Sequence, residues 1–197
     1  MNKLKKLIVA AGLMISISAF TLTNQTEAAT AHTVQYGETY WKIAKGFGIP
    51  INSLMNANNN KPLIAGQTIT LPNSPISAAD EDLMARLVRA EAVGEPYAGK
   101  VAVAAVILNR VKSPDFPNTV REVIYQISNG YYAFTPVANG QINQPADAES
   151  KKAVNEAIAL MGKGNGSLFF YNPKTSTSSW ILSRQVTVRI GNHVFAR

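Results

Sequence analysis

The spacing of apolar residues predicts a small α/β unit followed by a larger, mainly helical unit. Four elements are expected in the small unit, in the order strand, helix, helix, strand, at residues 32–36, 40–44, 51–56 and 68–71. Thr39 has the side chain that an N-cap requires, so the first helix should begin directly after it. Residues 73–79 contain Pro and Ser and predict a linker between a first domain at 32–72 and a second at 80–197.

Three stretches of the larger unit have helical spacing. They are expected to form helices at residues 81–93, 97–110 and 147–161. One apolar stripe follows the first helix and consists of Leu83, Met84, Leu87 and Val88. The second helix is apolar on nearly every side and should be the buried spine of the domain. The third has Asp147 as a suitable N-cap, and its acidic residues Asp147, Glu149 and Glu156 are expected on the solvated face.

The rest of the larger unit predicts shorter elements. A loop at 113–119 leads into a short helix at 120–127, and an irregular aromatic stretch follows at 129–136. Strands are expected at residues 168–171, 185–190 and 193–195, with Gly191-Asn192 as a hairpin turn between the last two. His193 flanks that turn and is expected to make a structural hydrogen bond. The pattern as a whole predicts an α+β fold, in which a βααβ module precedes a mainly helical domain with a C-terminal β-hairpin.

Residues 1–31 have the order of a secretory signal peptide. A basic segment at 2–6 precedes an apolar run at 7–20, and small residues follow. Cleavage is expected after Ala28 or Ala31. A retained membrane anchor is the alternative, but the apolar run is short for a span. Removal of residues 1–31 takes away three Lys and one Glu, which lowers the net charge from +7 to +5.

Composition restricts the possible chemistry. The chain has 197 residues, with no Cys and two His. A disulfide framework and a thiolate nucleophile are therefore excluded, and a zinc enzyme is disfavoured because the larger unit has His193 alone. Carboxylic acids are left as the catalytic candidates, and we expect no metal and no other cofactor. The positive charges are dispersed, with no run beyond Lys151-Lys152, so a nucleic-acid partner is not expected.

Glu91 has the most informative position among the carboxylic acids. It follows Leu87 by four residues and therefore falls within the apolar stripe. An apolar setting raises the pKa of a carboxyl group towards neutrality, which general-acid catalysis requires. The structural interpretation of the same position is a salt bridge to Arg110 or Arg121. Gly94 suits a C-cap, so Glu91 should lie one turn from the helix end, near a loop that opens onto a cleft.

Residues 32–72 carry a first resemblance to a known family. The matching motifs are His32-Thr33-Val34, the segment from Gly37 to Ala44, Ile64-Ala65-Gly66-Gln67 and Leu71-Pro72. They resemble a LysM domain along its whole length, which implies binding of glycan chains that contain N-acetylglucosamine. The resemblance assigns this binding to two loops, which contain Gly37, Glu38, Thr39, Ile64, Ala65 and Gly66. Trp41 and Ile43 are expected in the core whatever the loops bind.

Residues 80–197 carry a second resemblance. Its motifs are Arg89-Ala90-Glu91-Ala92-Val93-Gly94-Glu95-Pro96, Phe134-Thr135-Pro136-Val137, Phe170-Tyr171-Asn172-Pro173 and the segment from Ile190 to Phe195. They resemble the SleB/CwlJ family of cell-wall hydrolases, which includes spore cortex-lytic enzymes. The resemblance implies a lysozyme-like or lytic-transglycosylase-like fold with Glu91 as the catalytic acid. Ala90 stands where Gly is frequent in the family, which does not affect the chemistry.

Loop residues of the larger unit are candidates for substrate contacts, because exposed aromatic rings stack on sugar faces and polar side chains bind hydroxyl or N-acetyl groups. The candidates are Tyr131, Tyr132, Thr135, Gln141, Asn172 and Trp180. Phe134 is expected in the core instead. For Trp180, a role in anchoring its own loop is equally compatible with the sequence.

The resemblance implies a secreted enzyme that cleaves the glycan strands of peptidoglycan, in the cell wall or the spore cortex. It favours a lytic transglycosylase, in which one acid protonates the bond between MurNAc and GlcNAc and the muramic 6-hydroxyl closes an anhydro ring. A muramidase would need a second carboxylate, for which Glu95 is the candidate. An N-acetylmuramoyl-L-alanine amidase and a non-catalytic wall-binding or assembly protein stay open as two further classes. No stable membrane span is expected once the signal peptide is cleaved.

Overall fold

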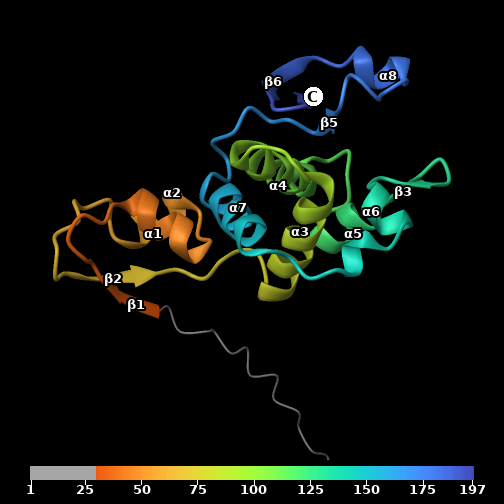
Figure 1. The fold of residues 1–197 in the computed structure, drawn as a ribbon. Helices are drawn as coiled ribbons and strands as arrows, with labels where there is room; N and C mark the ends of the chain where they lie inside the picture. Colours follow the sequence, from red (N-terminus) through yellow and green to blue (C-terminus); the bar gives the residue numbers. More distant parts are fainter. Residues whose placement is uncertain (1–29) are drawn as a thin grey trace, which may run out of the picture.

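The computed structural model describes residues 30–197, which form two packed units (Figure 1). The N-terminal unit consists of β1 (Thr30–Thr33), α1 (Tyr40–Phe47), α2 (Ile51–Ala57) and β2 (Thr68–Leu71). Strands β1 and β2 pair antiparallel. The predicted order of strand, helix, helix and strand is therefore confirmed, although β1 starts two residues earlier than expected and ends at Thr33.

Strand β1 overlaps the end of the predicted signal peptide, the rest of which lies outside the described residues. Thr30 pairs with Leu71, and Ala31 pairs with Thr70. Cleavage after Ala28 would leave this pairing whole, whereas cleavage after Ala31 would remove half of the strand. The folded unit therefore begins two residues before the predicted domain start.

The first helix forms where the sequence predicts it. The Thr39 hydroxyl accepts a hydrogen bond from the backbone N–H of Lys42 at 3.2 Å, which confirms Thr39 as the N-cap of α1. Ile43 and Ile69 are buried in the core of the unit, and Trp41 packs against it while partly buried. The small unit thus has the apolar core that its pattern predicts.

The larger unit is mainly helical, as expected. Its helical elements before the last sheet are α3 (Ala78–Glu91), α4 (Tyr97–Lys112), α5 (Val120–Ile124), α6 (Thr135–Ala138), the 3₁₀ turn η1 (Gln141–Asn143) and α7 (Ala148–Ala159). Helix α3 begins earlier than predicted because the Ser77 side chain accepts a hydrogen bond from the Asp80 N–H and caps it. All four residues of the predicted apolar stripe are buried, and so is half of α4.

Helix α7 lies between the two units and contacts α1 on one side and α3 and α4 on the other (Figure 1). Asp147 caps it, as predicted, by accepting a hydrogen bond from a backbone N–H of the first turn at 2.6 Å. Ala159, at the other end, is fully buried in the core of the N-terminal unit. The expectation that Glu156 is solvated is wrong, because Lys45 pairs with it at 3.3 Å and the Tyr97 hydroxyl donates to it at 2.9 Å.

The aromatic stretch after α5 is more regular than predicted. Strands β3 (Ile127–Ser128) and β4 (Tyr131–Tyr132) form a hairpin that projects from the helical unit (Figure 1). Asn129 and Gly130 make the turn with φ values of 51° and 83°. Positive φ at both central residues is the property of a type I′ turn, for which Asn-Gly is a favoured pair. The prediction of an irregular stretch is therefore wrong.

The C-terminal segment forms an antiparallel sheet of three strands in the order β5-β7-β6. Its elements are β5 (Phe169–Tyr171), the one-turn helix α8 (Ser179–Leu182), β6 (Val186–Ile190) and β7 (His193–Ala196). Gly191 and Asn192 connect β6 to β7, as predicted, and β5 pairs with the other edge of β7. The expected C-terminal hairpin is therefore confirmed, but it is part of a larger sheet.

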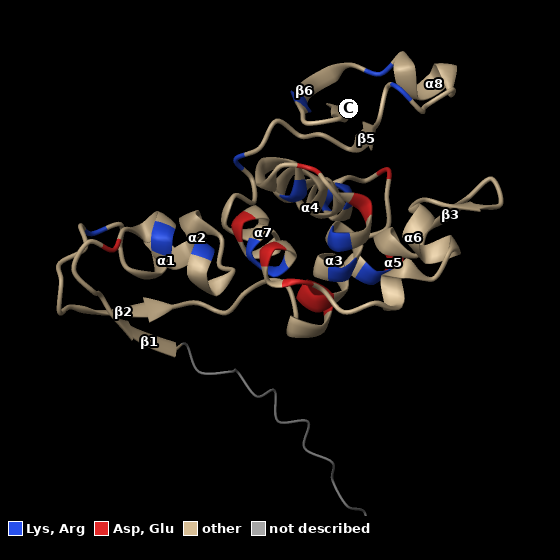
Figure 2. Ribbon diagram, viewed as in Figure 1, with Lys and Arg blue, Asp and Glu red and all other residues tan. Residues whose placement is uncertain are grey.

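Charged residues are distributed over both units (Figure 2). Lys and Arg occur on α1, α3, α4 and α7, and Asp and Glu lie among them on α3 and α7. In residues 30–197, no helix combines the length and the apolar character that crossing a membrane requires.

Candidate functional site

Glu91 is the last residue of α3 and continues its apolar stripe. Leu87 and Val88 are fully buried, and Glu91 is mostly buried beside them. In the described part of the chain, no group makes a hydrogen bond to its carboxylate, and no cation lies within 4.0 Å of it. The carboxyl group therefore lies in an apolar setting without a direct partner.

This setting changes the proton affinity of Glu91. Loss of hydration raises the pKa of its carboxyl group from an ordinary 4.5 to about 7, and the positive charge of Arg110 opposes the rise. At neutral pH the protonated and ionised forms are both well populated. Such a group can donate a proton and later take one back, so Glu91 is suited to general acid–base chemistry.

The helix end differs in detail from the prediction. Helix α3 ends at Glu91 with Ala92 as its C-cap, not at Val93 with Gly94 as the cap. Gly94 has a φ of 76° and turns the chain two residues later. Glu91 therefore lies at the helix terminus itself, directly before the turn that leads into α4.

Neither arginine that the sequence offers as a salt-bridge partner pairs directly with Glu91. Arg110 Nε donates to the Leu168 carbonyl at 2.8 Å, and the guanidinium of Arg121 lies 5.5 Å from the ring centroid of Tyr125. Arg110 nevertheless acts on Glu91 through its charge. Burial lowers the pKa of Arg110 to about 10, and the charge of Glu91 opposes that fall. The guanidinium therefore stays charged at neutral pH.

Glu95, the second predicted carboxylate, has a structural partner. Its carboxylate accepts hydrogen bonds from the backbone N–H of Asn192 at 2.9 Å and from Asn192 Nδ2 at 3.1 Å. These bonds join the turn after α3 to the turn between β6 and β7. A Cβ added at Gly191 would overlap the Glu95 carboxylate and come within 2.6 Å of Pro96 Cδ. Glu95 thus fixes the C-terminal sheet against the helices.

Two of the predicted substrate residues lie in segments that pack against α3. Helix α6, which begins with Thr135, and the turn η1, which begins with Gln141, both contact α3. Arg86 Nη1 donates to the Ile142 carbonyl at 3.1 Å and Arg89 Nη2 donates to the Gln141 carbonyl at 3.3 Å. The side chains of Thr135 and Gln141 are exposed. Helix α3 therefore holds the backbone of this segment, while the side chains of Thr135 and Gln141 face solvent.

The aromatic residues around β4 divide between surface and core. Tyr131 and Tyr132, on the β3–β4 hairpin, are 79% and 44% exposed, whereas Phe134 is 3% exposed. The prediction that Phe134 belongs to the core is therefore confirmed. The two tyrosines are available for contacts with a ligand.

Trp180 and Asn172 lie in the C-terminal segment. Trp180 belongs to the short helix α8, where the sequence predicts a loop, and is half-exposed. Its ring packs edge-on against Phe169 at 5.1 Å, and the guanidinium of Arg184 lies 4.1 Å from its centroid. These contacts support the interpretation that Trp180 anchors its own segment. Asn172 Oδ1 accepts a hydrogen bond from the Lys174 N–H at 2.9 Å.

His193 departs from the prediction. Its Nδ1 atom is buried without a hydrogen-bond partner in the described residues, so the expected structural hydrogen bond is not formed there. The ring instead lies 5.2 Å from Phe170 and 6.1 Å from Phe195. Burial lowers the pKa of His193, and the charge of Glu95 opposes that shift. His193 is thus an aromatic packing residue of the sheet.

The N-terminal unit has a surface hollow of about 370 Å³ where the LysM-like loops approach each other. It is lined by Glu38, Thr39, Tyr40, Met55, Asn60, Lys61, Pro62 and Leu63. Of the six residues predicted for glycan binding, Glu38 and Thr39 line it, while Gly37, Ile64, Ala65 and Gly66 do not. The second wall of the hollow is therefore formed by residues 60–63, which directly precede Ile64. Hydrogen bonds from the Gln35 N–H and from His32 lower the pKa of Glu38.

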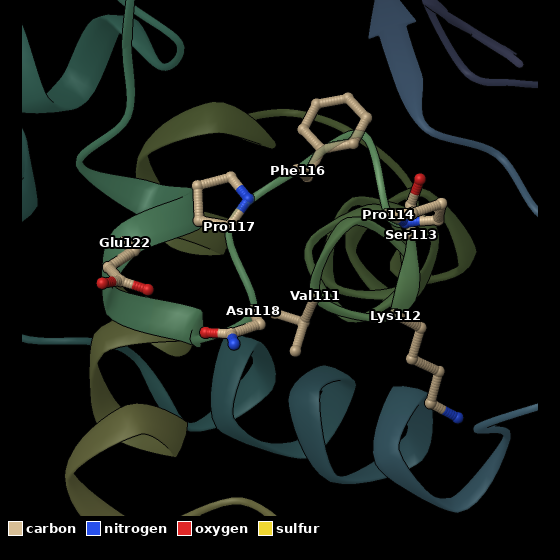
Figure 3. Close-up of a pocket in the computed structure, with 8 residues that line it drawn as sticks. All are labelled: Val111, Lys112, Ser113, Pro114, Phe116, Pro117, Asn118 and Glu122. Carbon is tan, nitrogen blue, oxygen red and sulfur yellow. The ribbon is translucent and has the colours of Figure 1, made fainter.

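A larger hollow of about 740 Å³ lies where α4 leads through a loop into α5 (Figure 3). Phe116 lines this hollow and also packs over Arg110, with the guanidinium 5.0 Å from the ring centroid. The sequence motifs do not single out Phe116. The available signal is the charge of Arg110 directly after the apolar run of the helix, because a charge that is buried there requires compensating contacts. In residues 30–197, no three His, Asp or Glu side chains cluster as a metal site requires.

Two family models match the chain: a LysM domain at residues 32–72 and a cell wall hydrolase domain at residues 94–196. A spore cortex-lytic enzyme of Halalkalibacterium halodurans is 47% identical over 125 residues, which cover 62% of this chain and 37% of that protein. A spore cortex-lytic enzyme of Bacillus cereus is 45% identical over 146 residues, which cover 74% of this chain and 54% of that protein. The chain thus spans about half or less of the length of these relatives.

Two solved structures are also similar. The catalytic domain of the germination-specific lytic transglycosylase SleB from Bacillus anthracis is 46% identical with a TM-score of 0.58, and the match covers 64% of this chain and 100% of that domain. The catalytic domain of the Bacillus cereus SleB protein is 45% identical with a TM-score of 0.56, and the match covers 64% and 94%. The larger unit therefore shares its fold with these catalytic domains.

Proposed function

The chain belongs to the cell wall hydrolase family and carries a LysM domain, and from that premise we propose that it is a secreted enzyme that cleaves peptidoglycan. We propose further that it is a lytic transglycosylase, which cuts the bond between MurNAc and GlcNAc with Glu91 as its acid and base. The observation that carries this proposal is the mostly buried, unpaired Glu91 carboxyl group with a pKa of about 7. The lytic transglycosylase named among the similar structures supports the type of reaction.

In the proposed reaction, the Glu91 carboxyl group gives its proton to the glycosidic oxygen while the bond from that oxygen to C1 of MurNAc breaks. The GlcNAc portion leaves as an alcohol. The 6-hydroxyl oxygen of the same MurNAc then attacks C1 and closes the 1,6-anhydro ring. The Glu91 carboxylate takes up the hydroxyl proton and returns to its starting form. One carboxyl group therefore supplies both proton transfers, and no water is consumed.

Substrate contacts are proposed for residues of the larger unit that are exposed or partly exposed. The two tyrosines of the β3–β4 hairpin offer ring faces to sugars, and Thr135 and Gln141 offer polar side chains on segments packed against α3. Asn172 and Trp180 are the candidates from the C-terminal segment. The arrangement favours a glycan strand that passes over the end of α3, between the hairpin and the sheet.

The LysM domain is proposed to hold the same polymer at a second point. Its hollow between Thr39 and Leu63 presents polar and apolar groups together, which suits a ring with N-acetyl and hydroxyl substituents. The spore cortex-lytic names of the relatives support the cortex as substrate and association with wall or cortex as location. Secretion follows from the predicted signal peptide.

The test compares wall digestion by the wild type and by Glu91→Gln. We expect the variant to lose about 10²- to 10⁴-fold in rate, because an amide cannot donate the proton. Glu149→Gln serves as the matched control, since Glu149 is an exposed carboxylate on α7 that pairs with Lys100. The control should digest walls at the wild-type rate. Near-wild-type digestion by Glu91→Gln would overturn the proposal.

Mass spectrometry of the fragments distinguishes the reaction types. Anhydro-muramic ends support the transglycosylase. Reducing ends would indicate a muramidase and would require Glu95 to leave Asn192. Free amino groups without anhydro sugars would indicate an amidase. Binding without any cleavage by the wild type would indicate a wall-binding protein. Digestion of cortex and vegetative wall in parallel tests the proposed substrate.

A further inference from the structure

Arg110 lies near the C-terminal end of α4 and is 7% exposed. Its guanidinium is 5.0 Å from the ring centroids of Phe116 and Phe134 and 5.6 Å from that of Phe169. Its Nε atom donates to the Leu168 carbonyl at 2.8 Å. We call these three phenylalanines the ring cage. It is assembled from the loop after α4, the segment before α6 and strand β5, so folding of the whole domain is needed to build it.

The ring cage fixes a charge without neutralising it. Aromatic faces attract a cation through their quadrupoles but carry no net charge. The single hydrogen bond to Leu168 fixes the orientation of the guanidinium plane. In the described residues, no carboxylate lies within 4.0 Å of Arg110. Burial of a cation without a carboxylate in contact costs desolvation free energy. The negative charge that partly offsets this cost is that of Glu91.

The separation between Arg110 and Glu91 is important for acid–base chemistry. A direct salt bridge would keep Glu91 ionised and occupy the oxygen that must receive a proton. Complete absence of a cation would leave a buried carboxylate without any stabilisation once its proton has moved. A charge held beyond contact distance stabilises the anion and leaves its lone pairs free.

Other charged groups do not compete for this role. Those of α3 and of the helices packed against it have separate partners or face solvent: Arg86 pairs with Asp82, Arg89 binds the Gln141 carbonyl, Arg121 lies over Tyr125, Glu156 pairs with Lys45, Lys100 pairs with Glu149, Glu122 binds Thr119, Asp80 binds Ser77, Glu81 binds Ser74, and Lys112, Lys151 and Lys152 are exposed. Helix α6 and the turn η1 contain no charged residue. Among the described residues, Arg110 is therefore the cation that acts on Glu91.

Building on the proposed role of Glu91, we propose that Arg110 is a positioning residue, whose ring-caged charge stabilises the Glu91 carboxylate formed when the proton moves to the glycosidic oxygen. It touches neither the substrate nor the reacting atoms. The cage keeps it out of pairing distance, so Glu91 stays free to take back the proton of the 6-hydroxyl.

The experiment compares the wild type with Arg110→Met, which keeps a long side chain and removes the charge. Turnover needs a protonated Glu91 and falls as pH rises through its pKa. Without the cation, the alkaline limb of the pH profile should move up by about one pH unit. The turnover number should fall while KM stays the same, because the charge acts on the proton transfers and not on binding. Arg110→Lys restores the charge and should move the limb back towards the wild type.

A direct titration separates this proposal from the function proposed above. Carboxyl-labelled glutamate gives an NMR signal for Glu91, assigned by its loss in Glu91→Gln. An upward shift of its midpoint in Arg110→Met supports the proposal even if the enzyme proves to have another activity. An unchanged midpoint overturns it, even if Glu91→Gln is inactive and the proposed function stands.

Phe116→Leu gives a second variant in case Arg110→Met does not fold, which circular dichroism would reveal. Phe116 also lines the hollow shown in Figure 3, so loss of its ring admits water to the guanidinium. Water screens the charge, and the Glu91 midpoint should rise by less than in Arg110→Met. If the midpoint in Phe116→Leu equals that of the wild type, the ring cage has no effect on Glu91 and the proposal is wrong.

Discussion

Glu91 differs from the other carboxylates of the described chain in what surrounds it. Glu38 and Asp147 accept hydrogen bonds from backbone N–H groups, which lower their pKa values. Glu95 accepts two hydrogen bonds from Asn192. Glu91 has none, so loss of hydration dominates and raises its pKa to about 7. The neighbours of a carboxylate therefore decide whether it caps a helix, as Asp147 does, joins two turns, as Glu95 does, or has a raised pKa, as Glu91 does.

The raised pKa also makes a prediction for stability. Folding moves the pKa of Glu91 from 4.5 to about 7, so between these values the folded state binds more protons than the unfolded state. The stabilisation of the folded state by the protonated Glu91 carboxyl group is complete below pH 4.5 and is lost as pH rises through 7. It amounts to about 3 kcal/mol as an upper limit. Glu91→Gln should therefore lose less stability than the wild type between pH 4 and pH 8, as measured by urea unfolding.

The other titrating groups are the same in both proteins, so their contributions cancel in this comparison. Glu149→Gln, with its change at an exposed site, should follow the wild-type pH dependence. Parallel curves for the wild type and Glu91→Gln would mean that burial of Glu91 has no energetic cost. The expected gain in stability on loss of the acid is typical of a strained functional site.

At the level of elements, local signals predicted most of the helices and strands. The apolar stripe of α3 placed Glu91, and the N-caps Thr39 and Asp147 were assigned from side-chain type alone. The hairpin of β3 and β4 was missed although its Asn129-Gly130 turn was visible in the sequence.

Other features depend on contacts that spacing cannot show. The pairing of β5 with β7 and the ring cage of Arg110 each join segments far apart in the chain. The sequence showed that Arg110 needs partners but not which residues supply them. Likewise, the two hydrogen bonds from Asn192 to Glu95 join residues that are 97 positions apart in the sequence. The sequence alone therefore presents Glu95 as a catalytic candidate and not as a residue that holds the β6–β7 turn.

The turn between β6 and β7 provides a prediction at this level. Gly191 has a φ of 58°, and a Cβ there would overlap the Glu95 carboxylate. Gly191→Ala should therefore destabilise the protein by about 2 kcal/mol in urea unfolding, through backbone strain and displacement of Glu95. Gly164→Ala is the matched control, because Gly164 has open space around its Cβ position and no positive φ. Equal stability of the two variants would show that the turn adapts without cost.

On the scale of the whole molecule, α7 connects the two packed units. It packs against α3 and α4, which carry Glu91 and Arg110, and also against α1 of the LysM domain. Ala159 enters the LysM core, and Glu156 joins Lys45 of α1 to Tyr97 of α4. The LysM domain and the two helices that carry Glu91 and Arg110 are thus packed on one helix, which fixes the position of the LysM domain relative to Glu91.

A substitution on α7 tests this connection. Ala159→Asp places a charge in the LysM core, where Ala159 is fully buried, although the residue lies outside the LysM segment 32–72. An uncompensated buried charge costs at least about 3 kcal/mol, so the LysM domain should melt earlier in calorimetry and binding to washed peptidoglycan should weaken. Ala148→Asp, at the exposed first turn of the same helix, should change neither measurement. If Ala159→Asp also left both unchanged, the LysM domain would fold independently of α7, and the enzyme would bind and cut its polymer as two loosely joined parts.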